Sequence, residues 1–442
     1  MSPKDTSSPT VHGDSTDNQY ATPSLHLRVP SGGQTGQPDP TPRINRKGSY
    51  GQRIAAAWRV VFRPHTRTIN DPGPLRLLCF DGGGVRGLSS LFILKEFLHR
   101  VQNNPGFVRP GNIEKNGEIL PCEYFDMICG TSTGGLIAIM LGKLRMSVDE
   151  TIKAYIRLSE DVFSKKKWFW KDARYSAKAL EKAICTIIGE RAQHIQEVDG
   201  TQMEASDLEA LGRSIMMRPR GNESETQGCK VFVYALNAQN ADAETNIRTY
   251  RVMENELDDF AIWEAARATS ADPFFFKLMV IQPSPEVGRM FSGIYVDGGL
   301  RHSNPIGQLF QEAAKVFPNR PTGFVLSLGT GQRNAIQFPC AGCVPKLQLL
   351  QVFNLLRQIA ANCEATHQDI GKKFTSRRNI YFRFNVDQGL QDVGLEWRNE
   401  GKISAHTSTY MSKDETNKHL REAVNAFISL QSSTDIRKIV GK

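Results

Sequence analysis

A serine flanked by glycines lies at residue 132, in the sequence Gly-Thr-Ser-Thr-Gly that begins at Gly130. An apolar run, Tyr124–Cys129, precedes it and another, Leu136–Leu141, follows it, so the serine falls where a strand gives way to a helix. Nucleophilic serines of acyl hydrolases occupy such a turn, because glycines two positions away relieve crowding and the helix N-terminus faces the developing oxyanion. Ser132 is therefore predicted to be a nucleophile, with Gly130 and Gly134 forming its elbow.

A second glycine-rich turn, Asp81–Gly87, reads Asp-Gly-Gly-Gly-Val-Arg-Gly and follows the apolar run Leu75–Phe80. It contains the Gly-x-Gly-x-x-Gly pattern of dinucleotide-binding turns, which also calls for an acidic residue about 20 positions further on. Counting from Gly84 reaches Asn103 and Asn104 instead. Consecutive glycines can present backbone N–H groups to an oxyanion, and a nearby cation adds positive potential. An oxyanion hole is thus favoured, and a dinucleotide turn is the alternative. The residues predicted to form the oxyanion hole are Gly82, Gly83, Gly84 and Arg86.

A serine nucleophile needs a base, and Asp297 is the favoured candidate. It directly follows the apolar run Ile294–Val296, and the glycines Gly298 and Gly299 after it form a turn that displays its carboxylate at a strand end. An aspartate with an ordinary pKa of about 3.9 is a weak base unless its site is desolvated, so the oxyanion donors would carry more of the catalysis. The competing interpretation is an ordinary Asp-Gly turn.

A histidine-containing triad is a further alternative. The chain has nine histidines, and none stands in a turn that obviously pairs with Ser132. His302 would give the order Ser-Asp-His, but it lies only five residues beyond Asp297. That separation leaves little chain to bring the imidazole behind the serine, so a Ser-Asp pair is favoured.

These residues need a scaffold, and the apolar pattern indicates one. Apolar runs alternate with helical periodicity, which predicts a mostly parallel α/β sheet covered on both faces. The expected strands are Leu75–Phe80, Tyr124–Cys129, Val231–Leu236, Ile294–Val296, Phe324–Leu328 and Ile380–Phe384. The expected helices are Leu88–Leu98, Leu136–Leu141, 147–161, 176–188, 260–269, 305–317, Leu347–Ala365 and Asn417–Ser429.

The composition changes along the chain and indicates its division into parts. Residues 1–52 are polar and poor in aliphatic clusters, so they are expected to be a disordered tail. Residues 53–73 are expected to form a basic amphipathic linker. We expect a catalytic domain at 74–310, and at 311–442 a continuation of the α/β core that becomes mainly helical.

Bulk composition excludes several classes of protein. The 442 residues are 40% hydrophobic and include no apolar stretch long enough to span a bilayer. The N-terminus lacks the apolar core of a secretory signal, so we expect a cytoplasmic protein that can associate peripherally with membranes. The eight cysteines include one Cys-x-x-Cys, Cys340–Cys343, without a second pair at zinc-finger spacing. No metal site and no cofactor are therefore expected.

Three motifs together identify a family. The glycine turn Asp81–Gly87, the elbow Gly130–Gly134 and the turn Asp297–Gly299 occur in an order and at a spacing that resembles the patatin-like phospholipases. A fourth stretch, Ala265–Pro273, is similar to the family segment that precedes the aspartate strand. The resemblance covers about residues 75–310.

This resemblance implies a three-layer α/β/α fold and a Ser132–Asp297 dyad that works without histidine. It also implies that the glycine loop forms the oxyanion hole, and that lipid acyl esters are cleaved without calcium. Ser303 stands where the family usually has an asparagine, although Asn304–Pro305 follows the family pattern, and Asp272 replaces a small residue. These departures leave the head-group and acyl preference open.

The expected partner is lipid at a membrane or lipid-droplet surface. The formal charge of +9 suits anionic partners, but no nucleic-acid-binding motif accompanies it. Two segments combine basic and aromatic residues as interfacial anchors do, Lys165–Lys171 and Arg53–Arg63 around Trp58, although aromatics turned into the core would read the same way. The favoured function is a lipid acyl hydrolase. The alternatives are a non-catalytic lipid- or nucleotide-binding module and a transacylase.

Overall fold

The computed structural model describes residues 73–108, 118–164, 174–196, 203–218, 228–252, 259–285, 289–332, 362–391, 393 and 400–441. The glycine turn, the serine elbow and the aspartate turn all lie within these ranges. The basic aromatic segments 53–63 and 165–171, the Cys340–Cys343 pair and residues 1–52 lie outside them.

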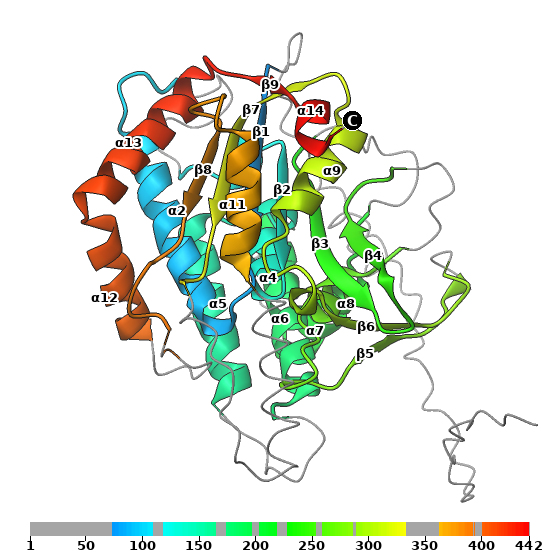
Figure 1. Cartoon of the computed structure of the whole chain (residues 1–442). Helices are drawn as coiled ribbons and strands as arrows, with labels where there is room; N and C mark the ends of the chain where they lie inside the picture. The colour runs from blue at the N-terminus through cyan, green and yellow to red at the C-terminus, as the bar shows by residue number, and fades with distance from the viewer. Residues whose placement is uncertain are drawn as a thin grey trace, which may run out of the picture. The chain divides into compact units, whose positions relative to one another are not determined.

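A largely parallel sheet forms the centre of the described part of the chain (Figure 1). Its strands follow the order β5-β6-β3-β2-β1-β7-β8, with β4 paired to β3 and β9 paired to β7. The mutually parallel strands are β1 (Leu75–Phe80), β2 (Met127–Thr131), β3 (Lys230–Asn237), β7 (Pro321–Leu328) and β8 (Tyr381–Phe384). The antiparallel additions are β4 (Asn240–Arg248), β5 (Met279–Ile281), β6 (Gly293–Asp297) and β9 (Thr434–Asp435).

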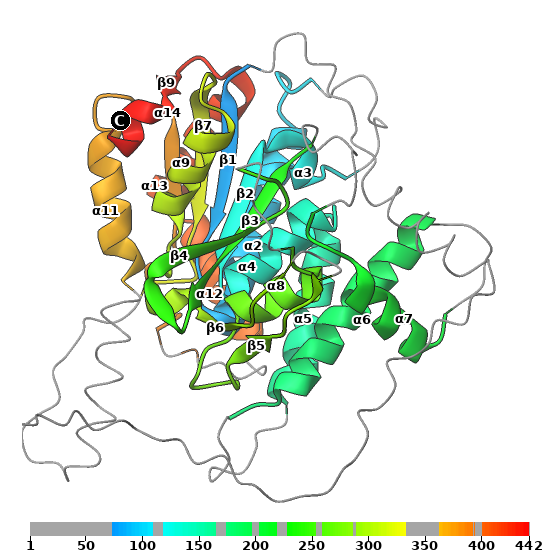
Figure 2. The same ribbon diagram turned by 90° about the vertical axis from the view of Figure 1, so that its right-hand side faces the viewer.

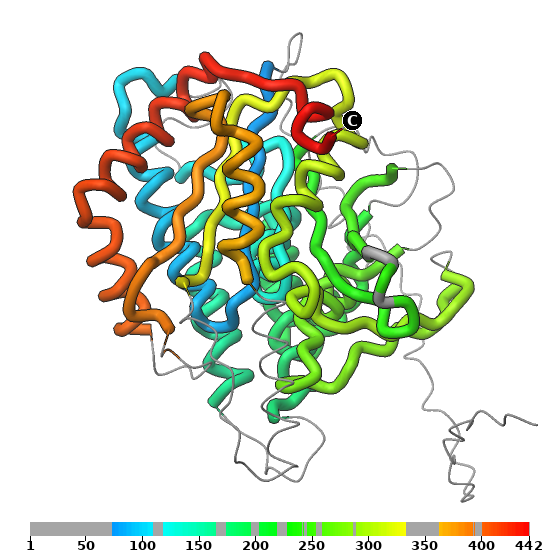
Figure 3. Tube along the Cα trace, in the orientation of Figure 1, coloured from blue at the N-terminus to red at the C-terminus, as the bar shows by residue number. Residues whose placement is uncertain are grey.

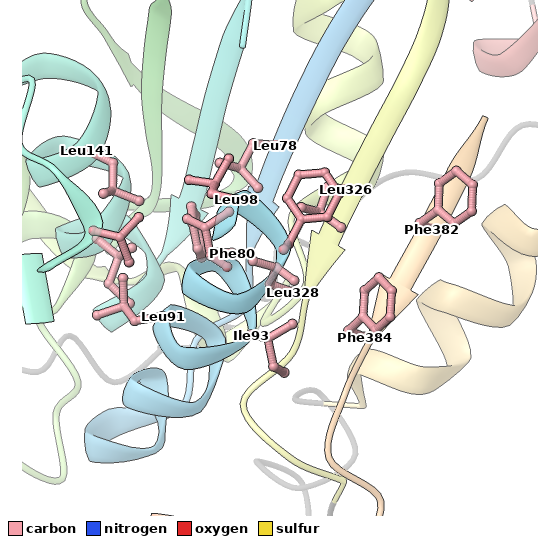
Figure 4. Close-up of a cluster of buried hydrophobic side chains, with 14 of the residues drawn as sticks. Leu78, Phe80, Leu91, Ile93, Leu98, Leu141, Leu326, Leu328, Phe382 and Phe384 are labelled. Carbon is pink, nitrogen blue, oxygen red and sulfur yellow. The ribbon is translucent and has the colours of Figure 1, made fainter. Parts of the chain in front are cut away.

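Alternate residues of the central strands serve opposite faces, as the two-residue period of a strand requires. Leu78 and Phe80 of β1 belong to a buried cluster with Leu326 and Leu328 of β7. Figure 4 shows these side chains, with Phe382 and Phe384 of β8, directed toward α2. The helices packed on this face are α2 (Gly87–Gln102), α4 (Thr133–Ala138), α5 (Val148–Phe163), α12 (Glu400–Met411) and α13 (Asp414–Ser429).

The intervening residues face the other layer. Leu77 and Cys79 of β1 belong to a second cluster that includes Phe310 of α9 and Ile436 of α14. The helices here are α9 (Ile306–Val316), α11 (Cys363–Lys373) and α14 (Ile436–Val440). Sheet and helices thus form the three-layer α/β/α arrangement expected from the sequence.

A third cluster packs around β3 toward the β6–β5 end of the sheet, on the same face as α4 and α5, and Figure 2 shows α6 and α7 side by side there. The helices are α6 (Ala177–Gln196), α7 (Ala205–Ser214) and α8 (Ile262–Thr269). None of the helices in the described residues combines the length and apolarity needed to cross a bilayer.

The chain after residue 310 continues the same sheet. Strand β7 pairs with β1, and β8 pairs with β7. Figure 3 follows this trace from β7 through α11 to β8, beside the blue strand β1. Both strands were expected from the sequence, at Phe324–Leu328 and Ile380–Phe384.

Most predicted elements are present, with shifted ends. The strand expected from Tyr124 begins at Met127, because Pro121–Tyr124 forms the short helix α3. The helix expected at 136–141 starts at Thr133 and changes at Ile139 to a wider turn, η2 (Ile139–Lys143). Most of the helix expected at 347–365 lies outside the described residues. The elements that the pattern did not predict are α3, α7, α12, α14, most of α11, and β4, β5 and β9.

Candidate active site

Ser132 sits in a strained turn between β2 and α4. Its φ of 56° and ψ of −128° are rare for a residue with a side chain. Such strain persists only where the surroundings enforce it, and it lifts the side chain out of the turn. The fold therefore places Ser132 in a sharp turn between a strand and a helix, with Gly130 and Gly134 on either side of it.

The flanking glycines are required by close backbone packing. A Cβ atom at Gly134 would lie 2.5 Å from the carbonyl oxygen of Asp81 and 2.6 Å from that of Phe80. One at Gly130 would clash with the backbone of Gly134. The elbow is thus pressed against the end of β1, which brings the serine beside the glycine loop.

Thr269 holds the elbow from the opposite side. Its hydroxyl accepts a hydrogen bond of 2.9 Å from the Ser132 N–H and donates one of 2.7 Å to the carbonyl of Tyr234. The residue is fully buried at the end of α8. Sequence reasoning did not single it out, although it lies in the segment Ala265–Pro273 that carries part of the family resemblance.

Asp297 meets Ser132 directly. The Ser132 hydroxyl donates a 2.6 Å hydrogen bond to Oδ2 of Asp297. The other carboxylate oxygen accepts a 2.7 Å bond from the Gly299 N–H, and the Asp297 N–H donates to the carbonyl of Ala271 at 3.1 Å. Strand register explains the meeting, because Asp297 of β6 pairs with Ala235 of β3, one residue beyond the partner of Thr131.

The Asp297 carboxylate is buried and is followed by a tight turn. Asp297 is only 4% exposed, and the glycines Gly298 and Gly299 begin a helical turn directly after it. A Cβ at Gly298 would meet the ring and carbonyl of Tyr234, so this turn too is packed tightly. Arg267 is buried nearby. Burial lowers the pKa of its guanidinium, while the charges of Glu181 and Asp297 favour its protonated form.

His302 lies beside Tyr234 of β3. Its ring packs against the ring of Tyr234 with centroids 5.4 Å apart, and its N–H donates to the carbonyl of Gly298. The Ser132 hydroxyl is directed to Asp297 instead.

The glycine loop lies beside the serine, but its N–H groups differ in their partners. Gly82 packs under the serine, since a Cβ there would lie 3.1 Å from Cβ of Ser132. Its N–H donates a 2.9 Å bond to the carbonyl of Ser303. This N–H is therefore engaged in the present conformation, contrary to the expectation that it serves an oxyanion. The Gly83 N–H makes a longer bond, 3.2 Å, to the hydroxyl of Thr133.

Arg86 turns back onto the loop rather than toward an oxyanion. Its Nε donates to the carbonyl of Gly83 at 3.3 Å, and a terminal nitrogen donates to the carbonyl of Leu390 at 3.4 Å. In a trans peptide the C=O and N–H point in opposite directions, so holding the Gly83 carbonyl also orients the Gly84 N–H. Arg86 thus contacts the loop through the carbonyl of Gly83, and its contribution to an oxyanion hole stays a prediction.

Two further hydroxyls fix the loop. Tyr155 of α5 donates a 2.6 Å bond to the carbonyl of Gly84, whose φ of 62° favours glycine. Thr330, just after β7, donates a 3.1 Å bond to the carbonyl of Gly82. Neither was predicted, because each reaches the loop from a distant part of the chain. Helix α5 begins with a capping box in which Ser147 and Glu150 exchange hydrogen bonds of 3.2 and 2.7 Å.

Titratable side chains elsewhere do not form a cation site in the described ranges. No group of three or more His, Cys, Asp or Glu side chains there is arranged to hold a metal ion. The site described above combines one hydroxyl, one carboxylate and backbone N–H groups. These are groups that suit acyl transfer.

Comparison with known proteins finds one family and several relatives. The model of one family, described as patatin-like phospholipase, matches residues 78–310. Calcium-independent phospholipase A2-gamma of Mus musculus is 26% identical over 376 residues, which cover 83% of this chain and 41% of that protein. Phospholipase A I of Arabidopsis thaliana is 25% identical over 389 residues, covering 78% of this chain and 27% of that protein.

A shorter relative gives a similar picture. Patatin-like protein 2 of Oryza sativa subsp. japonica is 24% identical over 279 residues, covering 58% of this chain and 61% of that protein. The chain spans about two fifths of the length of the phospholipase A2-gamma relatives that it matches.

Proposed function

The chain belongs to the patatin-like phospholipase family, and on this premise we propose that it hydrolyses acyl esters of phospholipids or related glycerolipids. The observation that carries the proposal is the 2.6 Å hydrogen bond from the Ser132 hydroxyl to Asp297 at a strained elbow. A serine next to a buried carboxylate and beside a glycine loop suits nucleophilic attack on an ester carbonyl.

Acylation uses Asp297 as the base. As Oγ of Ser132 attacks the ester carbon, its proton passes to the carboxylate and the carbonyl π electrons move onto oxygen. The Gly84 N–H stabilises this oxyanion, together with the Gly83 N–H once it exchanges the 3.2 Å bond to the Thr133 hydroxyl for the oxyanion. Each such donor is worth on the order of 10²–10³ in rate elsewhere. The intermediate then collapses, the bond to the alcohol breaks, and the alcohol leaves with the proton from Asp297.

Deacylation repeats these steps with water. Asp297 takes a proton from water as its oxygen adds to the acyl carbon, the oxyanion re-forms, and the ester bond to Ser132 breaks. The proton returns to Oγ and the fatty acid leaves. An alcohol in place of water would accept the acyl group, which is the transacylase alternative. All charge is handled by groups of the chain, so we propose that neither calcium nor another cofactor is needed and that a chelator leaves the activity unchanged.

The substrate is proposed to be presented at a lipid surface, and the hairpin β5–β6 is a suitable contact. Phe291 and Met290 are 84% and 62% exposed, and Leu278 and Val280 are exposed on the same hairpin. Because β6 runs antiparallel to β3 and Asn237 pairs with Tyr295, the start of β6 projects beyond the carboxyl ends of the central strands, where Ser132 lies (Figure 1).

A pair of variants tests this contact. Phe291→Ser should weaken cosedimentation with vesicles of phosphatidylcholine and phosphatidylglycerol, while hydrolysis of a monomeric short-chain ester stays unchanged. Val108→Ser is the matched control, because Val108 is 83% exposed but follows α2, which runs away from the site. Equal vesicle binding by Phe291→Ser and wild type would contradict the contact. The contact would also be contradicted if the wild type were a dimer in solution and Phe291→Ser a monomer. That result would assign the hairpin to contact with a second copy of the chain.

A fluorophosphonate probe tests the catalytic proposal itself. The wild-type protein should be labelled and should release fatty acid from phospholipid vesicles, whereas Ser132→Ala should do neither. Absence of labelling in the wild type would favour a non-catalytic lipid- or nucleotide-binding module. Labelling followed by transfer of the acyl group mainly to an added alcohol would favour a transacylase.

A further inference from the structure

A buried ion pair lies at the root of the glycine loop. Asp81, the residue before Gly82, receives two hydrogen bonds from Arg383 of β8, at 2.6 and 3.0 Å. We propose that this pair positions the oxyanion loop, so that Arg383 governs transition-state stabilisation without touching the substrate. The inference rests on the proposed function of the loop and adds a residue from beyond the 78–310 match.

The pair is enclosed on all sides. Asp81 is 1% exposed and the Arg383 side chain 3%. Arg383 also donates to the hydroxyl of Ser327 at 2.9 Å and to the carboxylate of Glu364 at 2.9 Å. The guanidinium thus links β7, α11 and the end of β1, and its planar fork fixes the direction of the Asp81 side chain.

Asp81 connects this anchor to both parts of the site. Its N–H donates to the carbonyl of Leu328 at 3.0 Å, which joins it to the end of β7. Its own carbonyl lies against Gly134, where no Cβ would fit. A displaced Asp81 would therefore move the loop at Gly82–Gly84 and release the packing of the serine elbow.

The same network reaches the loop by a second route. Asn385, two residues after Arg383, donates to Glu364 at 2.7 Å and accepts a 2.7 Å bond from the Gly331 N–H. Gly331 adjoins Thr330, whose hydroxyl holds the carbonyl of Gly82. The polar cluster of Arg383, Glu364 and Asn385 thus contacts the loop by two routes, through Asp81 and through Gly331 and Thr330.

The chemistry of the pair also favours a positional role. Burial raises the pKa of the Asp81 carboxyl, and the charge and hydrogen bonds of Arg383 oppose that rise. Buried ion pairs are seldom more stabilising than apolar side chains of similar volume. A bidentate pair, however, sets direction far more tightly than apolar packing does, and an oxyanion hole depends on direction.

The test compares two buried ion pairs. Arg383→Gln is paired with the control Arg248→Gln, because Arg248 likewise binds a fully buried carboxylate, that of Glu312, but on the helical layer of α9. Steady-state kinetics on a soluble ester should show a 10- to 100-fold lower kcat for Arg383→Gln with KM within threefold of wild type. Affinity for a trifluoromethyl ketone, whose serine adduct carries the oxyanion, should fall by the same factor. Arg248→Gln should change neither.

Two conservative variants keep the inference falsifiable if Arg383→Gln does not fold. Arg383→Lys keeps the charge but loses the bidentate geometry, and Asp81→Asn keeps the shape but loses the charge. Arg383→Lys should recover part of kcat. The inference is wrong if folded Arg383→Gln has the same kcat and the same ketone affinity as Arg248→Gln. If Arg383→Gln does not fold, the same comparison is made with Arg383→Lys and Asp81→Asn. Either result leaves the proposed function standing.

Hydrogen exchange separates the two proposals if the wild type has no esterase activity. Peptides that span Asp81–Gly87 should exchange faster in Arg383→Gln, or in Asp81→Asn, than in Arg248→Gln. Equal exchange would overturn the positional role on its own, whatever the fate of the proposed function.

Discussion

Two segments of one sheet contribute to the site in different ways. The segment matched by the family, residues 78–310, contains each group proposed to take part in the reaction: Ser132, Asp297 and the N–H groups of Gly83 and Gly84. The segment after residue 310 supplies β7 and β8 and contributes residues that hold those groups, Thr330 and Arg383 among them.

The difference follows from what each role demands of the sequence. A reacting group needs a specified backbone around it, such as the turn with φ of 56° at Ser132, and neighbouring residues must permit that backbone. The requirement leaves a local motif. A supporting hydrogen bond needs only a donor of suitable length arriving from somewhere in space. Arg383 is 302 residues from Asp81, so no spacing rule links them.

The largest expected effect is a loss of activity on changing Asp297, in the first segment. Asp297→Asn should lower kcat by about 10³- to 10⁴-fold, since a positioned general base contributes on the order of 10²–10⁴ and the carboxylate also orients the hydroxyl. Ester hydrolysis with purified, folded protein measures it. His302→Ala is the control and should retain activity. The reverse pattern would assign the base to histidine.

Next in size is a change that perturbs the packing between elbow and loop. Gly134→Ala would place Cβ 2.5 Å from the Asp81 carbonyl oxygen, and neither backbone can yield without moving the site. We expect about a 100-fold loss of activity and a loss of stability of about 1–3 kcal/mol, the usual range for overpacking. Gly307→Ala in α9 is the control, because a Cβ there meets nothing within 4 Å. Urea denaturation should show it unchanged or slightly more stable.

A smaller effect is expected in the second segment. Thr330→Val keeps the shape of the side chain and removes its bond to the Gly82 carbonyl. We expect about a tenfold lower kcat, since a hydrogen bond is worth about 0.5–1.5 kcal/mol and one carbonyl loses its partner. An unchanged kcat would show that Thr330 is not needed to hold the loop. The second segment would then lose one of its two proposed supporting residues.

The smallest effect concerns the stability of the fold at acidic pH. It arises from the ion pair of Arg248 and Glu312, which connects the two segments away from the site. Burial acts to raise the pKa of the Glu312 carboxyl, but hydrogen bonds and charge from Arg248 and Lys315 outweigh it and hold the pKa below its ordinary value. The stabilisation is present above the unfolded-state pKa and is lost as the pH falls through the folded-state pKa. A shift of one unit corresponds to about 1.4 kcal/mol.

Glu312→Gln therefore should be less stable than wild type at pH 7, with a difference that shrinks as the pH falls below about 4.5. Urea denaturation at a series of pH values measures this. A difference that grows on acidification would show that burial, rather than Arg248, dominates the pKa of Glu312.

The predictable part of the molecule is its local part. Apolar runs gave the strands β1, β3, β7 and β8 within a few residues, because a buried parallel strand needs a continuous apolar stretch. Strand β5 has three residues and β4 is largely polar, Asn-Ala-Asp-Ala-Glu-Thr-Asn-Ile-Arg, so neither has a pattern to detect. Arg383 lies within the otherwise apolar strand β8, and a charged residue there indicates that a buried partner exists, which the structure shows to be Asp81.

The sequence alone determined the residues on which the proposed chemistry rests: a serine in a glycine-flanked turn, an aspartate before two glycines and a loop of three glycines. Each of these depends on backbone conformations that only certain neighbouring residues allow, so the chain records them locally. Tertiary structure decided which N–H groups of the loop are engaged, that Arg86 turns back onto Gly83, and that Thr269, Thr330 and Arg383 hold the site. Those contacts join residues far apart in sequence, and their geometry exists only once the sheet has brought its strand ends together.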